Sequence, residues 1–147
     1  MKLDKNANDQ EKLEKANISN DMFAGREKRF INLIIDTIMY YLIATLIMLI
    51  INVLGEDMKE NTFYTYLIMY GSHFTYYSLL EHFARGKTVG KFITKTRVLT
   101  KTRELPSLHT TMLRSFCRFI PFEAFSNLGK PPRGWHDSFS KTYVIND

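Results

Sequence analysis

Residues 30–54, FINLIIDTIMYYLIATLIMLIINVL, decide the fold of this chain. The stretch is apolar on all sides, and Asn32 and Asp36 place two strongly polar side chains near its start. A helix of about 25 residues with a rise of about 1.5 Å each extends roughly 37 Å, enough to cross a hydrocarbon core of about 30 Å. The sequence therefore predicts a membrane-spanning helix, because a buried helix of a soluble protein is rarely so long and so uniformly apolar.

A second apolar block, FYTYLIMYGSHFTYYSLLEHF, occupies residues 63–83 and is more amphipathic. It follows Asn61 and Thr62, which are typical helix caps, and ends before Gly86. The short segment GEDMKENT, residues 55–62, joins the two blocks. The sequence thus predicts a second span, antiparallel to the first in a hairpin.

Basic residues flank the two predicted spans and give the chain a formal net charge of +5. Arg26, Lys28 and Arg29 precede the first span, a basic run beginning at Arg85 follows the second, and the connecting loop has Lys59 alone. Since Lys and Arg near span ends stay on the cytoplasmic side, both termini are expected in the cytoplasm. The basic residues are expected to meet anionic lipid headgroups. Nucleic acid is not an expected partner, because no stacking aromatics or recognition-helix pattern accompany the charge.

The remaining composition excludes several classes of site. Residues 1–22 are rich in Lys, Asp, Glu and Asn and predict a disordered tail, so that residues 23–147 form the membrane domain. The single cysteine, Cys117, excludes an internal disulfide and a cysteine-based zinc site. The histidines have no recognised metal-ligand spacing, so no metal and no cofactor is predicted. No nucleophile and base pair is apparent, and the chain is not expected to be an enzyme.

The segment after the second span predicts a turn, an extended stretch and a third helix. The Gly90 and Lys91 pair fails as a phosphate-binding loop, because Phe92 follows where Ser or Thr is required. We expect a turn over residues 86–90 and an extended stretch over residues 96–99. A helix over residues 107–120 has Ser107 as its cap, an apolar stripe, and Arg114 and Arg118 on the opposite face. It is too short and too charged to span, which predicts an interfacial or re-entrant helix on the cytoplasmic side of an all-α membrane protein.

Polar side chains recur at three- and four-residue intervals on both predicted spans. The stripe on the first span comprises Arg29, Asn32, Asp36 and Tyr40, and that on the second comprises Tyr66, Tyr70, His73, Tyr77 and Glu81. We expect the stripes to face each other, with Arg29 reaching Glu81 and with Asp36 contacting Tyr77, Arg114 or Arg118. The network then either holds the spans together by hydrogen bonds or relays ions or protons through Asp36 and Glu81, with His73 nearby.

The chain contains five motifs in order: R-F-I-N-L-I-I-D, E-H-F-A-R-G-K-T-V-G-K, T-R-V-L, L-R-S-F-C-R-F-I-P and G-W-H-D-S-F-S-K-T-Y-V-I. In these motifs the chain resembles the RDD family of bacterial membrane proteins, named for one arginine and two aspartates. The resemblance covers residues 26–145. The resemblance equates the arginine with Arg29, or alternatively Arg26, and the aspartates with Asp36 and Asp137. It further matches the family turn, with Gly86, Thr88, Gly90 and Lys91, and the family helix, with Arg114 and Arg118.

The resemblance also bears on the topology and supplies one candidate function, beside which a second stays open. Asp137 is expected in a cytoplasmic tail segment, and FIPFEAFSNL at residues 119–128 is too short for the third span that many members have. Transport of cations, protons or small ligands is proposed for the group, and two spans would require a homo-oligomer to enclose a pathway. The alternative is a non-catalytic membrane scaffold or accessory subunit that binds a partner membrane protein.

Overall fold

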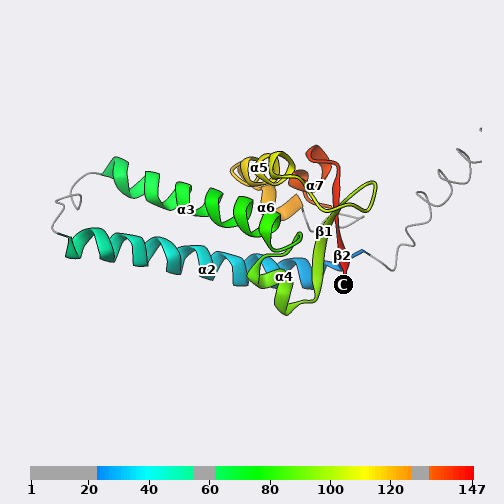
Figure 1. Cartoon of the computed structure of the whole chain (residues 1–147), viewed down its shortest axis with the longest axis horizontal. Helices are drawn as coiled ribbons and strands as arrows, with labels where there is room; N and C mark the ends of the chain where they lie inside the picture. The colour runs from blue at the N-terminus through cyan, green and yellow to red at the C-terminus, as the bar shows by residue number, and fades with distance from the viewer. Residues whose placement is uncertain (1–22, 55–61, 127–132) are drawn as a thin grey trace, which may run out of the picture.

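The computed structural model describes residues 23–54, 62–126 and 133–147 (Figure 1). The predicted tail at residues 1–22 and most of the predicted loop between the spans lie outside these ranges. The described elements, in chain order, are α2 (Arg26–Val53), α3 (Thr62–Phe83), α4 (Val89–Ile93), β1 (Thr96–Thr100), α5 (Leu108–Cys117), α6 (Glu123–Ser126), α7 (Trp135–Phe139) and β2 (Thr142–Asn146).

The two long helices, α2 and α3, lie side by side along the long axis of the molecule and are called the helix pair below (Figure 1). Within the described ranges α2 is the one helix long and apolar enough to cross a membrane, and 11% of its most apolar stretch is buried. Core helices of soluble proteins are mostly buried, whereas α2 exposes side chains such as Ile38, Leu42 and Leu49. The tyrosines and threonines of α3 make it more polar, and its membrane crossing stays a prediction.

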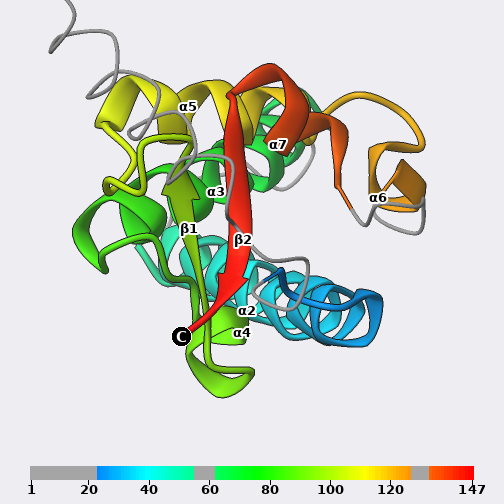
Figure 2. The ribbon, with the colours of Figure 1, turned by 90° about the vertical axis from the view of Figure 1, so that its right-hand side faces the viewer.

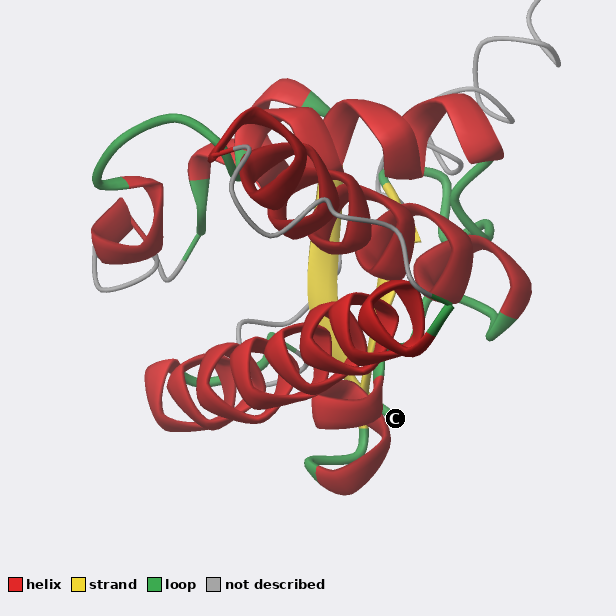
Figure 3. Ribbon diagram, turned by 90° about the vertical axis from the view of Figure 1, so that its left-hand side faces the viewer, coloured by secondary structure: helices red, strands yellow, loops and turns green. Residues whose placement is uncertain are grey.

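The remaining elements, α4 to α7 with β1 and β2, gather at one end of the helix pair and are called the cap. Figure 2 looks onto this end, and Figure 3 looks along the helix pair from the other end, with the strands behind the helices. Strands β1 and β2 pair antiparallel with Val98 opposite Val144, and Phe23 adds a bridge to Ile145. Ala24, Val98 and Val144 form a small apolar core.

The all-α prediction is therefore wrong, because the cap contains a two-stranded sheet. The extended stretch predicted at residues 96–99 is confirmed as part of β1. Its partner β2 lies far along the chain in the predicted tail segment, where no local pattern identifies a pairing partner. Sheet pairing over such a sequence separation depends on tertiary structure.

Helix α5 buries its polar face and exposes its apolar stripe. Ser107 caps its start by accepting a hydrogen bond from the Thr110 amide at 3.3 Å, and the helix ends at Cys117, before Pro121. Its polar face, including Thr111 and Arg114, is buried, and α5 packs against α3 and α7. The apolar stripe is instead exposed, with Phe116 at 69%. A helix at a membrane surface needs such an outward apolar stripe, and that placement stays a prediction.

The predicted turn at residues 86–90 is right in its first half. Gly86 has a φ of +81°, and a Cβ there would lie 2.4 Å from the Val98 carbonyl oxygen, so glycine is required at this position. Gly90 does not belong to a turn. It lies inside α4, which Thr88 caps by accepting a hydrogen bond from the Lys91 amide.

Candidate functional site

A buried cluster of ionised side chains joins the cap to the helix pair. Its cations are Arg29 from α2, Lys91 from α4, Arg114 from α5 and Arg118 just after α5; its anions are Asp36 from α2, Glu81 from α3, Glu123 from α6 and Asp137 from α7. None of the four carboxylates is more than 4% exposed. A buried ion requires partners that replace its lost hydration, so each contact in this cluster matters for folding.

Asp137 bridges two arginines that are distant in sequence. The Oδ2 atom accepts a hydrogen bond from Arg29 Nη1 at 2.5 Å, and Oδ1 accepts one from Arg114 Nη1 at 2.6 Å. Burial opposes ionisation of Asp137, but His136 and the two arginines outweigh it and hold the pKa of the carboxyl well below its usual range. Asp137 is therefore a charged link between α2, α5 and α7.

Glu81 is the most heavily paired carboxylate of the cluster. Its Oε1 accepts hydrogen bonds from Lys91 Nζ at 2.8 Å and from Arg118 Nη2 at 3.3 Å. Its Oε2 accepts one from Arg114 Nε at 2.7 Å. Burial lowers the pKa of Lys91, against the opposing attraction of Glu81 and Asp36. Glu81 thus ties α3 to both α4 and the end of α5.

Asp36 is held by neutral donors. Its Oδ1 accepts hydrogen bonds from the Tyr76 hydroxyl and the Gly90 amide, each at 2.8 Å, and its Oδ2 accepts one from the Thr88 hydroxyl at 2.6 Å. A Cβ at Gly90 would lie 2.7 Å from the Asn32 carbonyl oxygen and 3.0 Å from Asp36 Oδ1. Glycine at this position is therefore needed to bring α4 against α2.

Two further groups extend the cluster to the sheet and to α6. Asn32 donates to Thr96 Oγ1 at 3.1 Å and accepts from the Thr94 hydroxyl at 2.6 Å, which fixes α2 to β1. At the other side His136 Nδ1 contacts Glu123. Burial, helped by Arg118, lowers the pKa of His136 to about 4, so the ring is neutral near pH 7.

Charge within the cluster is balanced. The four cations face four carboxylates, and His136 adds no charge. Burial raises the pKa of Glu123, but the hydrogen bond from His136 outweighs it and brings this pKa down to about 2. Arg118 stacks its guanidinium on the Tyr77 ring, 4.1 Å from the centroid. A cavity of about 20 Å³, lined in part by Asp36, Lys91 and His136, lies within the cluster and has room for one water.

The structure brings most of the sequence-predicted polar residues into this cluster. They are Arg29, Asn32, Asp36, Tyr77, Glu81, Thr88, Gly90, Lys91, Arg114, Arg118 and Asp137. Gly86 lies beside it, against β1. Tyr40 and His73 lie in an aromatic group beside the cluster, with their ring centroids 4.8 Å apart and the His73 ring 4.9 Å from that of Tyr77.

Two predicted contacts are wrong. Arg29 pairs with Asp137, whereas Glu81 pairs with Lys91, Arg114 and Arg118. Asp36 takes its hydrogen bonds from Tyr76, Thr88 and Gly90 instead of the predicted Tyr77 or arginines. Asp137, expected in a tail segment, lies in α7, which packs against α5 and β2, and its side chain is completely buried.

Sequence reasoning missed Tyr76, Thr96, Glu123, His136 and Thr142. Tyr76 could have been found, since it lies three residues after His73 of the stripe that was expected to face α2. Thr142 contacts Arg114, and Glu123 contacts His136, each across a chain reversal that carries no local signal. Among the described residues no group of three His, Cys, Asp or Glu side chains is placed to hold a metal ion.

Comparison with known proteins identifies one family. The family model described as the RDD family matches residues 23–143, which is most of the chain. No curated protein and no solved structure matches the sequence. The family match agrees with the largely exposed, apolar α2 in indicating a membrane-associated protein.

Proposed function

Because this chain belongs to the RDD family, we propose that it is a non-catalytic membrane scaffold with two spans, which binds a helix of a partner membrane protein. In this proposal α2 and α3 cross the bacterial cytoplasmic membrane with both termini on the cytoplasmic side. The cap lies at the inner leaflet, and its charge cluster fixes the relative position of the two helices.

The observation that carries the scaffold proposal is the closure of the charge cluster. Glu81 and Asp137 each accept hydrogen bonds from at least two cationic side chains, and Asp36 accepts three from neutral donors. A carboxylate that takes up and releases a cation must exchange its ligands, and these are engaged by buried protein groups. Such an arrangement favours a fixed structural role for the cluster.

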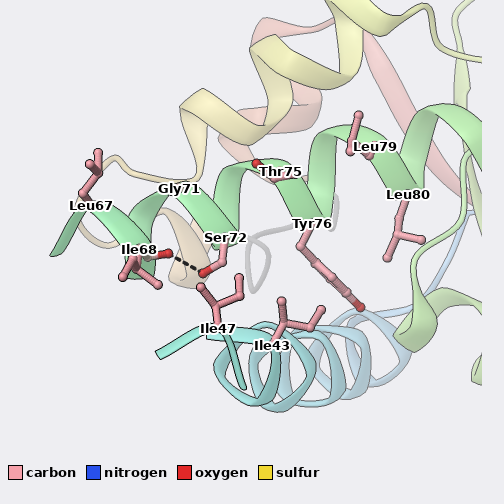
Figure 4. A pocket seen from close by; sticks show the side chains of 10 residues that line it. All are labelled: Ile43, Ile47, Leu67, Ile68, Gly71, Ser72, Thr75, Tyr76, Leu79 and Leu80. Carbon is pink, nitrogen blue, oxygen red and sulfur yellow. Dashed lines mark hydrogen bonds between the residues drawn. The ribbon is translucent and has the colours of Figure 1, made fainter. Parts of the chain in front are cut away.

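A groove between α2 and α3 supplies the docking surface in this proposal. It has a volume of about 520 Å³ and is lined by side chains including Ile43, Ile47, Gly71, Ser72, Thr75 and Leu79 (Figure 4). Gly71 has no atom within 4 Å of a Cβ built on it, and the Ser72 hydroxyl is satisfied by the Ile68 carbonyl oxygen at 2.6 Å. Small residues let a second helix approach closely within a membrane, where packing drives association.

Replacing Gly71 with Ile tests the scaffold. The Cβ of the new side chain meets no atom within 4 Å, and its outer carbons extend toward the groove. The protein should therefore purify normally but recover a partner protein from solubilised membranes poorly. Leu49→Ala, at an exposed side chain of α2 that does not line the groove, is the control, and it should leave recovery unchanged. Equal recovery of the partner protein by the original chain and by both variants would contradict the proposed docking surface.

Transport by an oligomer is the second candidate, and the small cavity beside Asp36, Lys91 and His136 favours it. A water in this cavity would lie between the Asp36 carboxylate and the side chains of Lys91 and His136. Burial lowers the pKa values of Lys91 and His136, and a proton relay needs groups with such shifted pKa values. Reconstituted protein should then move protons or cations across vesicles. Asp36→Asn should abolish the flux while the protein still folds, and normal flux in the variant would exclude the relay.

Orientation can be tested by labelling of single cysteines. In a Cys117→Ala background, Lys101→Cys should react with a membrane-impermeant reagent only after the cells are opened. Lys59→Cys should react in intact cells. The reverse pattern would place the cap on the outer side of the membrane.

A further inference from the structure

A second pocket lies between α2 and α3, on the side of α3 away from the groove, and is called the tyrosine pocket. It has a volume of about 330 Å³, and its lining includes Tyr40, Tyr66, Tyr70, His73, Arg118 and Phe119. The volume is at the small end of the range for small-molecule sites, which suits a single ring with substituents. The proposed docking groove shares no lining residue with this pocket, and the charge cluster meets it only at Arg118.

Aromatic rings dominate the lining of the tyrosine pocket. The His73 ring lies 4.8 Å from the Tyr40 ring and 5.1 Å from the Phe119 ring, between centroids. Tyr70 meets Phe119 edge to face at 5.7 Å, and Tyr66 stacks on Tyr70 at 6.2 Å. Rings at such separations can accept a further planar ring in offset or edge contact.

The polar atoms of the pocket residues limit the charge of a ligand. An aromatic cage would ordinarily favour a cation, but the Arg118 guanidinium is part of the lining and repels one. An anion is equally disfavoured, because the four cations of the charge cluster are already matched by Asp36, Glu81, Glu123 and Asp137. The charges around the tyrosine pocket therefore favour a neutral ligand.

Two nitrogen atoms of the pocket residues have unused hydrogen-bonding capacity. Among the described residues, His73 Nδ1 and Arg118 Nε are buried without a hydrogen-bond partner. Buried polar atoms without a partner are rare in folded proteins; the guanidinium can only donate, and His73 Nδ1 donates in one of the two neutral tautomers. A carbonyl oxygen on the ligand ring would supply the acceptor once the side chains turn toward the pocket.

We propose that the tyrosine pocket binds a neutral, lipid-soluble ring compound with carbonyl groups, of the quinone class. The proposal rests on α2 and α3 lying in the bilayer, which gives such a compound access from the lipid phase, and it does not depend on partner binding in the groove. Tyr66 and Tyr70, at 54% and 59% exposure, form the rim, whereas the Arg118 side chain, at 10%, lies at the base.

Binding of decylubiquinone to the full chain in detergent tests this site. Calorimetric titration should give saturable binding of decylubiquinone, and decylbenzene, 4-decylbenzoate and decyltrimethylammonium should compete poorly. Equal competition by decylbenzene would show simple apolar adsorption, and tighter binding of the benzoate would show an anion site. Either result overturns the proposal.

His73→Phe keeps a ring and removes the nitrogen, so it should weaken decylubiquinone binding about fivefold, the effect of one hydrogen bond. Tyr70→Leu removes an exposed ring and should also weaken binding, which keeps the test available if His73→Phe does not fold. Thr75→Val, on the groove side of α3, is the matched control and should bind like the original chain. So should Gly71→Ile, which separates this site from the scaffold function. Unchanged affinity in both His73→Phe and Tyr70→Leu would overturn the proposal.

Discussion

The cap end and the far part of the helix pair differ in where their polar and apolar side chains lie. At the cap end charged and hydroxyl side chains are inside, and apolar side chains such as Phe92 and Phe116 are outside. Farther along α2 and α3, apolar side chains dominate the exposed surface, and the space between the helices is a groove. The cap end is therefore held together by directional hydrogen bonds and ion pairs, whereas the far part depends on apolar surroundings that cover its exposed side chains.

The largest expected effect is at the centre of the cap. Glu81→Ala leaves three cations without their shared carboxylate and should lower the free energy of unfolding by about 3–5 kcal/mol. Thermal unfolding in detergent measures this loss. Glu104→Ala, at an exposed glutamate, is the control and should change stability little. A stable Glu81→Ala protein would mean that the cluster does not hold the cap.

The same substitution at two glycines compares the two regions directly. Gly90→Ala places a Cβ 2.7 Å from the Asn32 carbonyl oxygen and should cost about 1–3 kcal/mol. Gly71→Ala meets no atom within 4 Å and gains helix propensity, so stability should stay equal or rise by up to about 1 kcal/mol. Unfolding midpoints of the two variants should therefore move apart. Similar midpoints would contradict the close approach of α4 to α2.

Acid should weaken the cap more than the helix pair. The pKa of His136 is about 4 in the folded chain and near 6.5 when unfolded, so the unfolded state binds more protons between these values. The contribution of His136 to the free energy of unfolding is fully present above pH 6.5 and is lost as the pH drops toward 4, by at most about 3 kcal/mol. Glu123 and Asp137, with lowered pKa values, add to the loss below about pH 4.5.

Unfolding midpoints between pH 7.5 and pH 4.5 measure this acid effect. His136→Gln should flatten the upper part of the profile, because the group that binds the proton on unfolding is removed. An unchanged profile in the variant would assign the acid effect to the carboxylates alone.

The smallest stability effect is expected at the exposed apolar stripe of α5. Phe116→Ser, at a side chain 69% exposed, should change unfolding in detergent by about 0.5 kcal/mol or less. It should nevertheless weaken the seating of α5 on lipid vesicles, measured by quenching of a fluorophore on that helix. Equal quenching in the variant would show that α5 does not lie on the membrane.

The sequence by itself determined the three longest helices, α2, α3 and α5, and most residues of the cluster. The length and uniform apolarity of residues 30–54 require a long helix, and hydrophobic period, caps and breakers are local signals that placed α3, α5 and β1. The family motifs also identified Arg29, Asp36 and Asp137 before any contact was known. These features need only neighbouring residues or a motif to be recognised.

Only the tertiary structure decided which charge meets which. Arg29 and Asp137 are 108 positions apart, and their contact exists because β2 pairs with β1 and α7 packs against α5 and β2. A helical stripe gives the direction of a side chain but not its partner, so the sequence predicted Glu81 for Arg29 and carried no signal for Asp137. The inverted packing of α5 follows from the same cause, since the buried carboxylates of other elements draw Arg114 inward and leave the apolar stripe outside.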